Sequence, residues 1–222
     1  MLQAAAQRLL YVVGFGFFAL VFYLFNSLRH RGVRHMPRKG AVLLVANHQS
    51  FWDPVILGLV TVRPLRYIAR KSLYANKFLA HLMSALGAHP IDQDGSATAG
   101  IKAAIQLLKD GNAVLFFPEG NRTEDGALQE FKPGISLVLK RAPVMVLPVG
   151  LAGAYEAWPR WRKLPRFAPL FLPAAPGTIG VVFGEPIPSA KLLSMGQEEM
   201  LYFLRMEVMK LKEQAENLRR KV

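Results

Sequence analysis

From residue 40 onward, short apolar runs alternate with helical patterns, and this alternation restricts the fold more than any other feature. Strand-like runs occur at residues 41–46, 65–69, 88–91, 112–117, 144–149 and 178–183. Helical patterns occur at residues 54–60, 76–86, 97–109, 134–140 and 195–218. Parallel strands need a crossover of a dozen or more residues, usually a helix. The alternation therefore predicts an α/β domain with a largely parallel sheet flanked by helices.

The chain has 222 residues, a net charge of +13 and no cysteine. The missing cysteine excludes disulfides, thiolate metal sites and a cysteine nucleophile. So positive a charge indicates nucleic acid, an anionic membrane or an acidic substrate as partner. The sequence has no nucleic-acid-binding motif with the required spacing, so a membrane surface with anionic lipids is expected and nucleic acid is not. Three clusters carry many of the cations: Arg29, Arg31, Arg34, Arg38 and Lys39; Arg160, Arg162, Lys163 and Arg166; Arg219, Arg220 and Lys221.

The apolar segment at residues 9–28 contains no charged residue and is rich in phenylalanine. As a helix it would extend roughly 30 Å, about one hydrocarbon thickness, so it can just span a bilayer. Gly14, Gly16 and Asn26 permit a bend, which leaves a shallow, non-spanning anchor open, and a buried core helix is the third interpretation. The cations that follow would place the main domain on the cytoplasmic face. We therefore expect a hydrophobic membrane-anchoring helical segment with its basic flank at residues 1–39 and the main domain at residues 40–222.

Residues 157–176 interrupt the strand and helix pattern with tryptophans, prolines and cations, beginning with Trp158, Arg160, Trp161 and Arg162. Aromatic rings mixed with arginines are typical of the lipid headgroup boundary. A surface loop packed on the core explains the same composition, and the two interpretations stay open here.

His48 and Asp53 follow the first strand-like run, in the stretch that ends at Pro54. A carboxylate that holds a histidine fixes its tautomer and stabilises the imidazolium, which makes the histidine a general base. If Pro54 is the first helical residue, Asp53 lies near the helix N-cap and the intervening turn can fold His48 back towards it. Asp53 before Pro54 is also a good helix cap without any catalytic role.

A second candidate site, Phe117 to Arg122, follows the strand-like run at residues 112–117. Gly120 allows a tight turn that exposes amides to an anion, and Arg122 can bind a phosphate with two hydrogen bonds. Glu119 could pair with Arg122, and Lys132 is a further candidate cation. The alternative is an ordinary turn with a surface salt bridge. The histidines lack metal-ligand spacing, and neither the His-Glu-x-x-His nor the P-loop pattern is present, so no metal is expected.

Together these blocks resemble the glycerolipid acyltransferase family, whose best-known members are the 1-acylglycerol-3-phosphate (lysophosphatidic acid) acyltransferases. His48 and Asp53 are similar to the family's His-x-x-x-x-Asp motif. The second block is similar to Phe-Pro-Glu-Gly-x-Arg, and residues 146–149 are similar to a later apolar block with proline. The resemblance extends over about residues 40–186, and the N-terminal segment resembles the membrane-binding helices of such enzymes.

The resemblance implies an O-acyltransferase that moves a fatty acyl chain from an acyl thioester to the hydroxyl of a lysophospholipid, with 1-acylglycerol-3-phosphate as acceptor and phosphatidic acid as product. His48 would be the base and Asp53 its orienting partner. Acyl-CoA or acyl-carrier protein would be a co-substrate, and no cofactor is implied. The implied acceptor-binding residues are Glu119, Gly120, Asn121 and Arg122, with Arg70, Lys71 and Lys132 as further cations.

One position departs from the family pattern. Gln93 stands where the family usually has an arginine that helps to bind the acceptor's phosphate. Glutamine donates hydrogen bonds but carries no charge, so it cannot replace a bidentate contact between arginine and phosphate. Either Arg70, Lys71 or Lys132 compensates, or the acceptor is a different lyso-lipid.

Two other classes of protein remain as alternatives. A serine hydrolase would use Ser50 as nucleophile beside His48, but the Gly-x-Ser-x-Gly elbow is missing from the sequence. A non-catalytic membrane protein would bind anionic lipid through the basic clusters, and His48 would have no role in its function.

Overall fold

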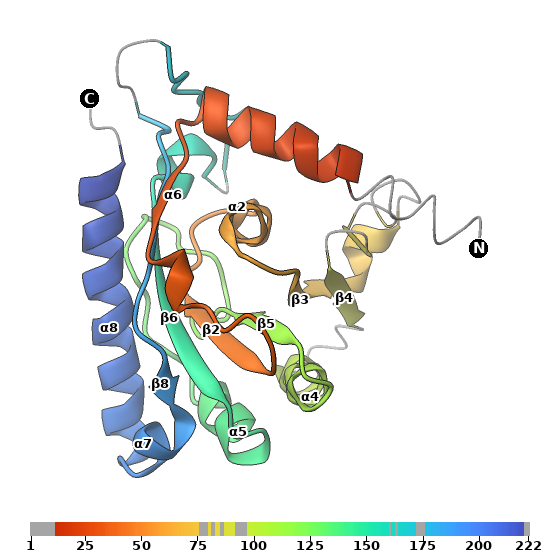
Figure 1. Cartoon of the computed structure of the whole chain (residues 1–222), viewed down its shortest axis with the longest axis vertical. Coiled ribbons are helices and arrows are strands. Elements are labelled where there is room, and N and C mark those ends of the chain that lie inside the picture. The colour runs from red at the N-terminus through yellow and green to blue at the C-terminus, as the bar shows by residue number, and fades with distance from the viewer. Residues whose placement is uncertain are drawn as a thin grey trace.

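The computed structural model describes residues 12–75, 80, 83–84, 87–91, 97–159, 161–162, 164–171 and 176–219, with the side chains of 70, 72, 73 and 97 left aside. Its centre is an eight-stranded sheet with the order β1-β7-β6-β2-β5-β3-β4, and β8 pairs with β6 (Figure 1). Strands β6, β2, β5, β3 and β4 run parallel to one another, whereas β7 and β8 run antiparallel to β6, and β1 runs parallel to β7. The expectation of an α/β fold with a largely parallel sheet is confirmed.

Six of the eight strands, β2 to β7, coincide closely with the apolar runs of the sequence, whereas β1 and β8 do not. They are β1 (Arg29–Arg31), β2 (Val42–Ala46), β3 (Leu65–Arg70), β4 (Ala88–Ile91), β5 (Ala113–Phe116), β6 (Met145–Ala152), β7 (Gly180–Phe183) and β8 (Ile187–Pro188). The helices outside the N-terminal segment are α2 (Asp53–Val60), α4 (Ala97–Lys109), α5 (Gly134–Arg141), α6 (Ala154–Ala157), α7 (Ser189–Leu193) and α8 (Gln197–Leu218), with the 3-10 turns η2 (Val33–His35) and η3 (Lys71–Tyr74). The helix predicted at residues 76–86 falls largely outside the described residues.

Strand β2 shows why both faces of the sheet are covered. All of its residues are buried. Leu43 and Val45 belong to one core cluster, with side chains of α4, α5 and α8. Val42, Leu44 and Ala46 belong to the other, with side chains of α2 and of the N-terminal helix. Because strand side chains alternate between faces, an unbroken apolar run is what a strand between two helical layers needs.

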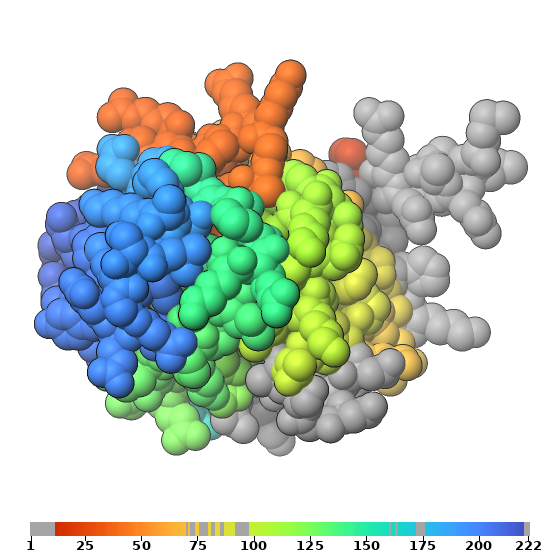
Figure 2. Space-filling model, turned by 90° about the horizontal axis from the view of Figure 1, so that it is seen from below, coloured from red at the N-terminus to blue at the C-terminus, as the bar shows by residue number. Residues whose placement is uncertain are grey.

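Helix α8 packs unusually close to the sheet. A Cβ atom built on Gly150 of β6 would lie 2.2 Å from the carbonyl carbon of Leu211, and one on Gly180 of β7 would lie 2.3 Å from the carbonyl oxygen of Ala215. Only glycine leaves room for the helix backbone at these two positions. Figure 2 shows α7 and α8 (blue), α5 (green) and α4 (yellow-green) side by side on the lower face of the molecule.

The N-terminal segment begins, within the described part, as an α-helix at residues 12–20 and continues as a π-helical turn, η1 (Val21–Phe25); we call residues 12–25 the N-terminal helix. No helix among the described residues is both long and apolar enough to cross a membrane. The first residues of the predicted basic flank belong to the sheet: Arg29, His30 and Arg31 form β1, which pairs with β7.

The N-terminal helix lies beside residues 158–171, which we call the aromatic segment. The amides of Ala168 and Leu170 donate to the carbonyls of Phe25 and Leu24, at 2.6 and 2.7 Å. The buried Asn26 amide donates to the carbonyls of Arg166 and Gly177, at 3.1 and 3.0 Å. Among the described residues, most of the exposed large apolar side chains belong to the N-terminal helix and the aromatic segment. They are Val12, Val13, Phe17, Leu20, Leu24, Phe25, Trp161, Leu164, Phe167, Leu170 and Phe171. We call this set the apolar surface.

Candidate active site

The two sequence motifs meet at the carboxyl ends of neighbouring strands. Strands β2 and β5 are parallel, with Val45 opposite Phe116. His48 leaves the end of β2 and Phe117 leaves the end of β5, so the pairing brings the two side chains together. Their rings stack with centroids 3.9 Å apart and an angle of 11° between the planes. This edge of a parallel sheet is where α/β proteins commonly bind their ligands.

His48 and Asp53 form a hydrogen-bonded pair, with 2.7 Å between Nδ1 and Oδ2. The same Oδ2 accepts the backbone amides of Gln49 and Ser50, at 2.5 and 2.8 Å. Asp53 opens α2 directly before Pro54, where the helix dipole favours a carboxylate. Asp53 is completely buried, whereas the His48 side chain is 19% exposed. An ionised carboxylate accepts a hydrogen bond from Nδ1–H, so the unprotonated Nε2 is left to accept a proton from a substrate.

Glu119 supports the histidine from the second motif. Its Oε1 accepts the backbone amide of His48 at 2.6 Å, and its Oε2 accepts the amide of Gln129 at 2.8 Å. The side chain is only 4% exposed. Burial raises the pKa of the Glu119 carboxyl, while the two backbone hydrogen bonds oppose that rise. The carboxylate therefore joins the histidine to the loop that follows the second motif.

The turn after Glu119 needs its glycine. Gly120 has a φ of +75°, a left-handed conformation that side chains disfavour. A Cβ atom there would also lie 2.9 Å from Nζ of Lys132, which shows that the lysine side chain lies over the turn. The amide of Lys132 donates to the carbonyl of Pro118 at 2.8 Å, and that of Thr123 donates to the carbonyl of His48 at 2.9 Å. Gly120, Lys132 and His48 thus belong to one connected unit.

The other predicted binding residues lie around this unit. Asn121 is exposed and Arg122 is half-buried, both within the turn. Arg70 ends β3, which pairs with β5, and the exposed Lys71 begins η3 directly after it. Gln93 lies outside the described residues.

Comparison with known proteins agrees with this arrangement. Residues 27–152, more than half of the chain, match the family model described as Acyltransferase. The chain belongs to the acyltransferase family.

Several curated members of the family are similar to this acyltransferase chain. It is 31% identical over 140 residues to a chloroplastic 1-acyl-sn-glycerol-3-phosphate acyltransferase of Arabidopsis thaliana, with 62% of this chain and 39% of the relative covered. It is 30% identical over 152 residues to the 1-acyl-sn-glycerol-3-phosphate acyltransferase of Streptococcus pneumoniae, with 66% and 56% covered. The enzyme of that name from Bacillus subtilis is 24% identical over 168 residues, with 75% and 77% covered. The chain thus spans well under two thirds of the first two relatives.

A solved structure has the same fold. The crystal structure of the 1-acyl-sn-glycerophosphate acyltransferase PlsC from Thermotoga maritima aligns with a TM-score of 0.68 at 22% identity, and the alignment covers 96% of this chain and 97% of that one. The agreement over nearly the whole of both chains supports the fold described above.

Asn47 is a structural residue of the candidate site that sequence reasoning missed. Its Nδ2 donates to the carbonyl of Leu151 at 2.9 Å, and its Oδ1 accepts the Leu151 amide at 2.8 Å. Asn47 is 1% exposed. These two hydrogen bonds attach the loop that contains His48 to the end of β6. Strand β6 lies next to β2, on the side opposite β5. The residue stands directly before His48 in the motif, and no local pattern indicates a partner 104 residues away.

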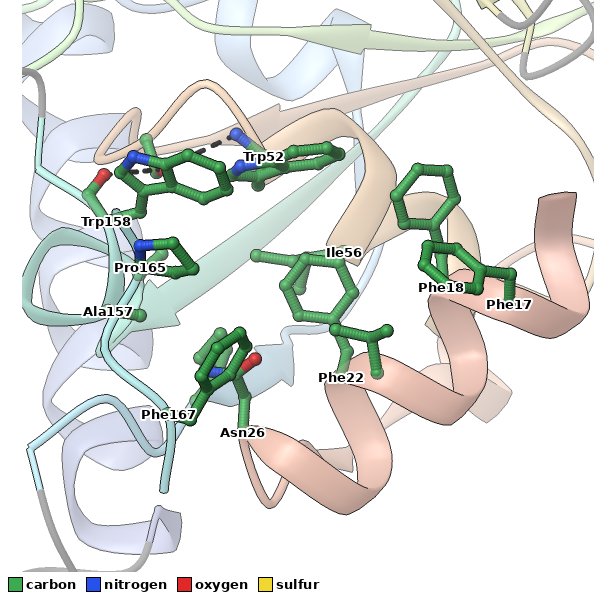
Figure 3. A pocket seen from close by; sticks show the side chains of 14 residues that line it. Phe17, Phe18, Phe22, Asn26, Trp52, Ile56, Ala157, Trp158, Pro165 and Phe167 are labelled. Carbon is green, nitrogen blue, oxygen red and sulfur yellow. Dashed lines mark hydrogen bonds between the residues drawn. The ribbon is translucent and has the colours of Figure 1, made fainter. Parts of the chain in front are cut away.

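A second feature of the acyltransferase chain is an apolar cavity of about 220 Å³ beside the motif loop (Figure 3). Residues of the N-terminal helix, α2, α6 and the aromatic segment line it, among them Phe18, Phe22, Trp52, Ile56 and Trp158. Ser50 contributes to the wall as well, but its hydroxyl donates to the carbonyl of Trp158 at 2.9 Å and the residue is 1% exposed. That placement speaks against Ser50 as the nucleophile of a hydrolase.

Proposed function

We propose that this chain transfers a fatty acyl chain from an acyl thioester to the hydroxyl of a lysophospholipid, and that 1-acylglycerol-3-phosphate is the acceptor. The hydrogen bond between His48 Nδ1 and Asp53 Oδ2 carries the proposal, since it leaves the partly exposed Nε2 as a general base. The names of the curated relatives support the acceptor.

In the proposed reaction, His48 Nε2 accepts the proton of the acceptor hydroxyl as its oxygen attacks the thioester carbonyl. The new ester carbon–oxygen bond forms, the carbon–sulfur bond breaks, and the imidazolium returns its proton to the departing thiolate. Asp53 stabilises the imidazolium in between. Glu119 acts as a positioning residue, because both of its oxygens accept backbone amides and one of those amides belongs to His48.

The acceptor's phosphate would bind at the turn of Gly120 to Arg122. Three features support this site: the left-handed glycine, the half-buried Arg122, and Lys132, whose ammonium group lies over the turn. Arginine and lysine are the usual phosphate-binding cations. Asn121, Arg70 and Lys71 are the outer candidates for headgroup contacts.

The lipid substrates place the chain at a bilayer. The apolar surface is the proposed contact, with Arg162 and Arg166 of the aromatic segment near lipid phosphates. The net charge of +13 favours anionic lipids, and the cations after the N-terminal helix favour the cytoplasmic face. Acyl-CoA and acyl-carrier protein are both candidate donors.

The decisive experiment is a panel of lyso-acceptors with and without phosphate, each supplied with acyl-CoA and with the acyl thioester of acyl-carrier protein. We expect the purified protein to acylate a phosphate-bearing acceptor, and we expect Gln93→Arg to lower KM for that acceptor without raising kcat. A control enzyme of known activity validates the assay. Labelled acyl groups released mainly as free fatty acid, regardless of acceptor, would identify a hydrolase instead.

The His48→Ala variant separates catalysis from lipid binding alone. Removal of a general base typically costs about 10²- to 10⁴-fold in rate. If His48→Ala kept the full cellular function of the protein, the non-catalytic alternative would be favoured.

A further inference from the structure

Trp52, the residue before Asp53, lies where the apolar surface and the catalytic loop meet. Its ring contacts two rings of the N-terminal helix, Phe18 and Phe22, with centroids 5.3 and 6.1 Å away. On its other side it contacts Trp158 of the aromatic segment, with centroids 5.3 Å apart (Figure 3). Both segments that form the apolar surface therefore touch one side chain of the catalytic motif.

A second link runs parallel to these ring contacts. The hydroxyl of Ser50 donates to the carbonyl of Trp158 at 2.9 Å, while the amide of Ser50 donates to Asp53 Oδ2. The indole of Trp158 donates in turn to the carbonyl of Arg162 at 2.9 Å, further along the aromatic segment. The loop that holds the carboxylate is thus joined to the aromatic segment by packing and by hydrogen bonds.

The cavity beside Trp52 leaves room for its ring to shift. The cavity of about 220 Å³ is bounded by Trp52, Trp158 and the inner rings of the N-terminal helix. In a close-packed interior, a ring cannot shift without clashing with its neighbours. An adjacent space lets the ring shift without such a clash. A shift of Trp52 moves the backbone of Asp53, and an error of about 1 Å in a catalytic group can cost roughly 10²-fold in rate.

We propose that Trp52 is a positioning residue through which contact of the apolar surface with a bilayer raises the catalytic rate constant. The inference rests on the proposed acyl transfer. A bilayer that fixes the N-terminal helix and the aromatic segment also fixes the rings on their inner sides. Those rings hold Trp52, and Trp52 holds Asp53 and with it the imidazole of His48. The lipid surface thus raises the catalytic rate constant as well as the local concentration of substrate.

The test measures kcat and KM for two acceptors: one in vesicles that contain anionic phospholipid, and a short-chain acceptor dissolved as monomers without vesicles. For the wild type we expect kcat to be about tenfold higher on vesicles. For Trp52→Ala we expect the vesicle kcat to fall to the value measured without vesicles, while vesicle binding and KM change by less than about twofold. Trp52→Phe should restore most of the difference, since a ring remains.

Phe203→Ala is the matched control. Phe203 is a half-buried aromatic residue of α8 that packs in the other core cluster, so its truncation costs comparable packing far from the loop. We expect a similar loss in thermal midpoint and an unchanged ratio of the two kcat values. Equal losses of kcat on both acceptors in Trp52→Ala, or a loss explained by weaker vesicle binding, would overturn the inference. A wild type without acyl transfer on either acceptor would instead overturn the proposed function.

A fluorescence measurement tests the same link without activity. The chain has three tryptophans, so Trp158→Phe combined with Trp161→Phe leaves Trp52 as the single emitter. We expect its emission to shift when anionic vesicles are added. An unchanged spectrum in fully vesicle-bound protein would overturn the inference.

Discussion

Asp53 has a structural role and a proposed catalytic role, and a single substitution separates the two. Its Oδ2 accepts two backbone amides and the His48 ring. Asparagine keeps an acceptor at this position and is itself a good residue at a helix start, but it cannot stabilise an imidazolium. We expect Asp53→Asn to fold and to lose about 10²- to 10⁴-fold in kcat with little change in KM.

Steady-state kinetics on Asp53→Asn and on Asp110→Asn check this. Asp110 is an exposed carboxylate that pairs with Gln106, so its variant should match the wild type. A kcat of Asp53→Asn within twofold of the wild type would show that the carboxylate has only the structural role.

Glu119 predicts a pH dependence of stability. Its pKa in the folded chain lies above the ordinary value of 4.5 because burial disfavours the charge. Between these two values the folded state holds a proton that the unfolded state has lost, so the free energy of unfolding falls as pH rises through this window. Glutamine does not titrate. The stability of the wild type relative to Glu119→Gln should therefore decrease with rising pH across the window and then level off.

Urea unfolding of both proteins at a series of pH values from about 4 to 8 measures this difference. Glu198→Gln, at an exposed position of α8, provides the comparison. A wild type that gained stability over Glu119→Gln as pH rose would reverse the expected sign.

At the residue scale, the sequence predicted that His48 and Asp53 lie together, and the structure pairs them because both belong to one loop. The partners of Glu119 and Asn47 could not be predicted. They are the backbone groups of His48, Gln129 and Leu151, and any residue type supplies such groups. Only the pairing of β2 with β5 and β6 brings them within reach.

At the element scale, the buried strands were predictable because each is a continuous apolar run, as β2 is. Strand β1 was not predicted. Its residues, Arg29 to Arg31, are all exposed and polar, and its place depends on backbone pairing with β7. The short elements β8, α6 and α7 have too few residues for a periodic pattern to identify them.

Gly150 tests how closely α8 must approach β6. An added Cβ would lie 2.2 Å from the helix backbone at Leu211 and Lys212, so the helix must move outward and its packing is lost. We expect Gly150→Ala to destabilise the fold by about 1–3 kcal/mol, or somewhat more if the backbone resists.

Gly58→Ala is the matched control for thermal unfolding, because a Cβ on Gly58 of α2 meets nothing within 4 Å. It should be neutral or stabilising by up to about 1 kcal/mol, since alanine is the better helix former. Equal midpoints for the two variants would contradict the close approach of α8.

At the scale of the whole molecule, the apolar surface predicts a measurable affinity for bilayers. Phe17 and Phe171 are 60% and 73% exposed. Phe17→Ser and Phe171→Ser should each raise the Kd for anionic vesicles by about tenfold, which corresponds to ~1.4 kcal/mol. Binding should also weaken as salt concentration rises and as anionic lipid is replaced by zwitterionic lipid, because salt screens the positive charge.

Vesicle sedimentation measures these affinities, with Tyr202→Ser as control. Tyr202 is 64% exposed on α8, outside the apolar surface. A Kd raised as much by Tyr202→Ser as by the phenylalanine variants would show that the apolar surface has no special part in binding.

The sequence indicated both halves of the apolar surface but not that they are joined. The composition of residues 9–28 and of residues 157–176 predicted contact with lipid. The composition of residues 157–176 was equally compatible with a surface loop packed on the core. The hydrogen bonds of Asn26 to Arg166 and Gly177 connect residues 140 and 151 positions apart. No local composition encodes such a contact.

The two outermost strands have a consequence for aggregation. An open edge strand is a template on which another copy of the chain can add a strand. Here β1 presents only exposed Arg29, His30 and Arg31, so two such edges repel each other. On the opposite edge, β4 contains Pro90, which has no amide proton to donate. Proteins held on a bilayer collide often in two dimensions, and on the bilayer contact proposed above these two edges would oppose pairing between the sheets of two copies.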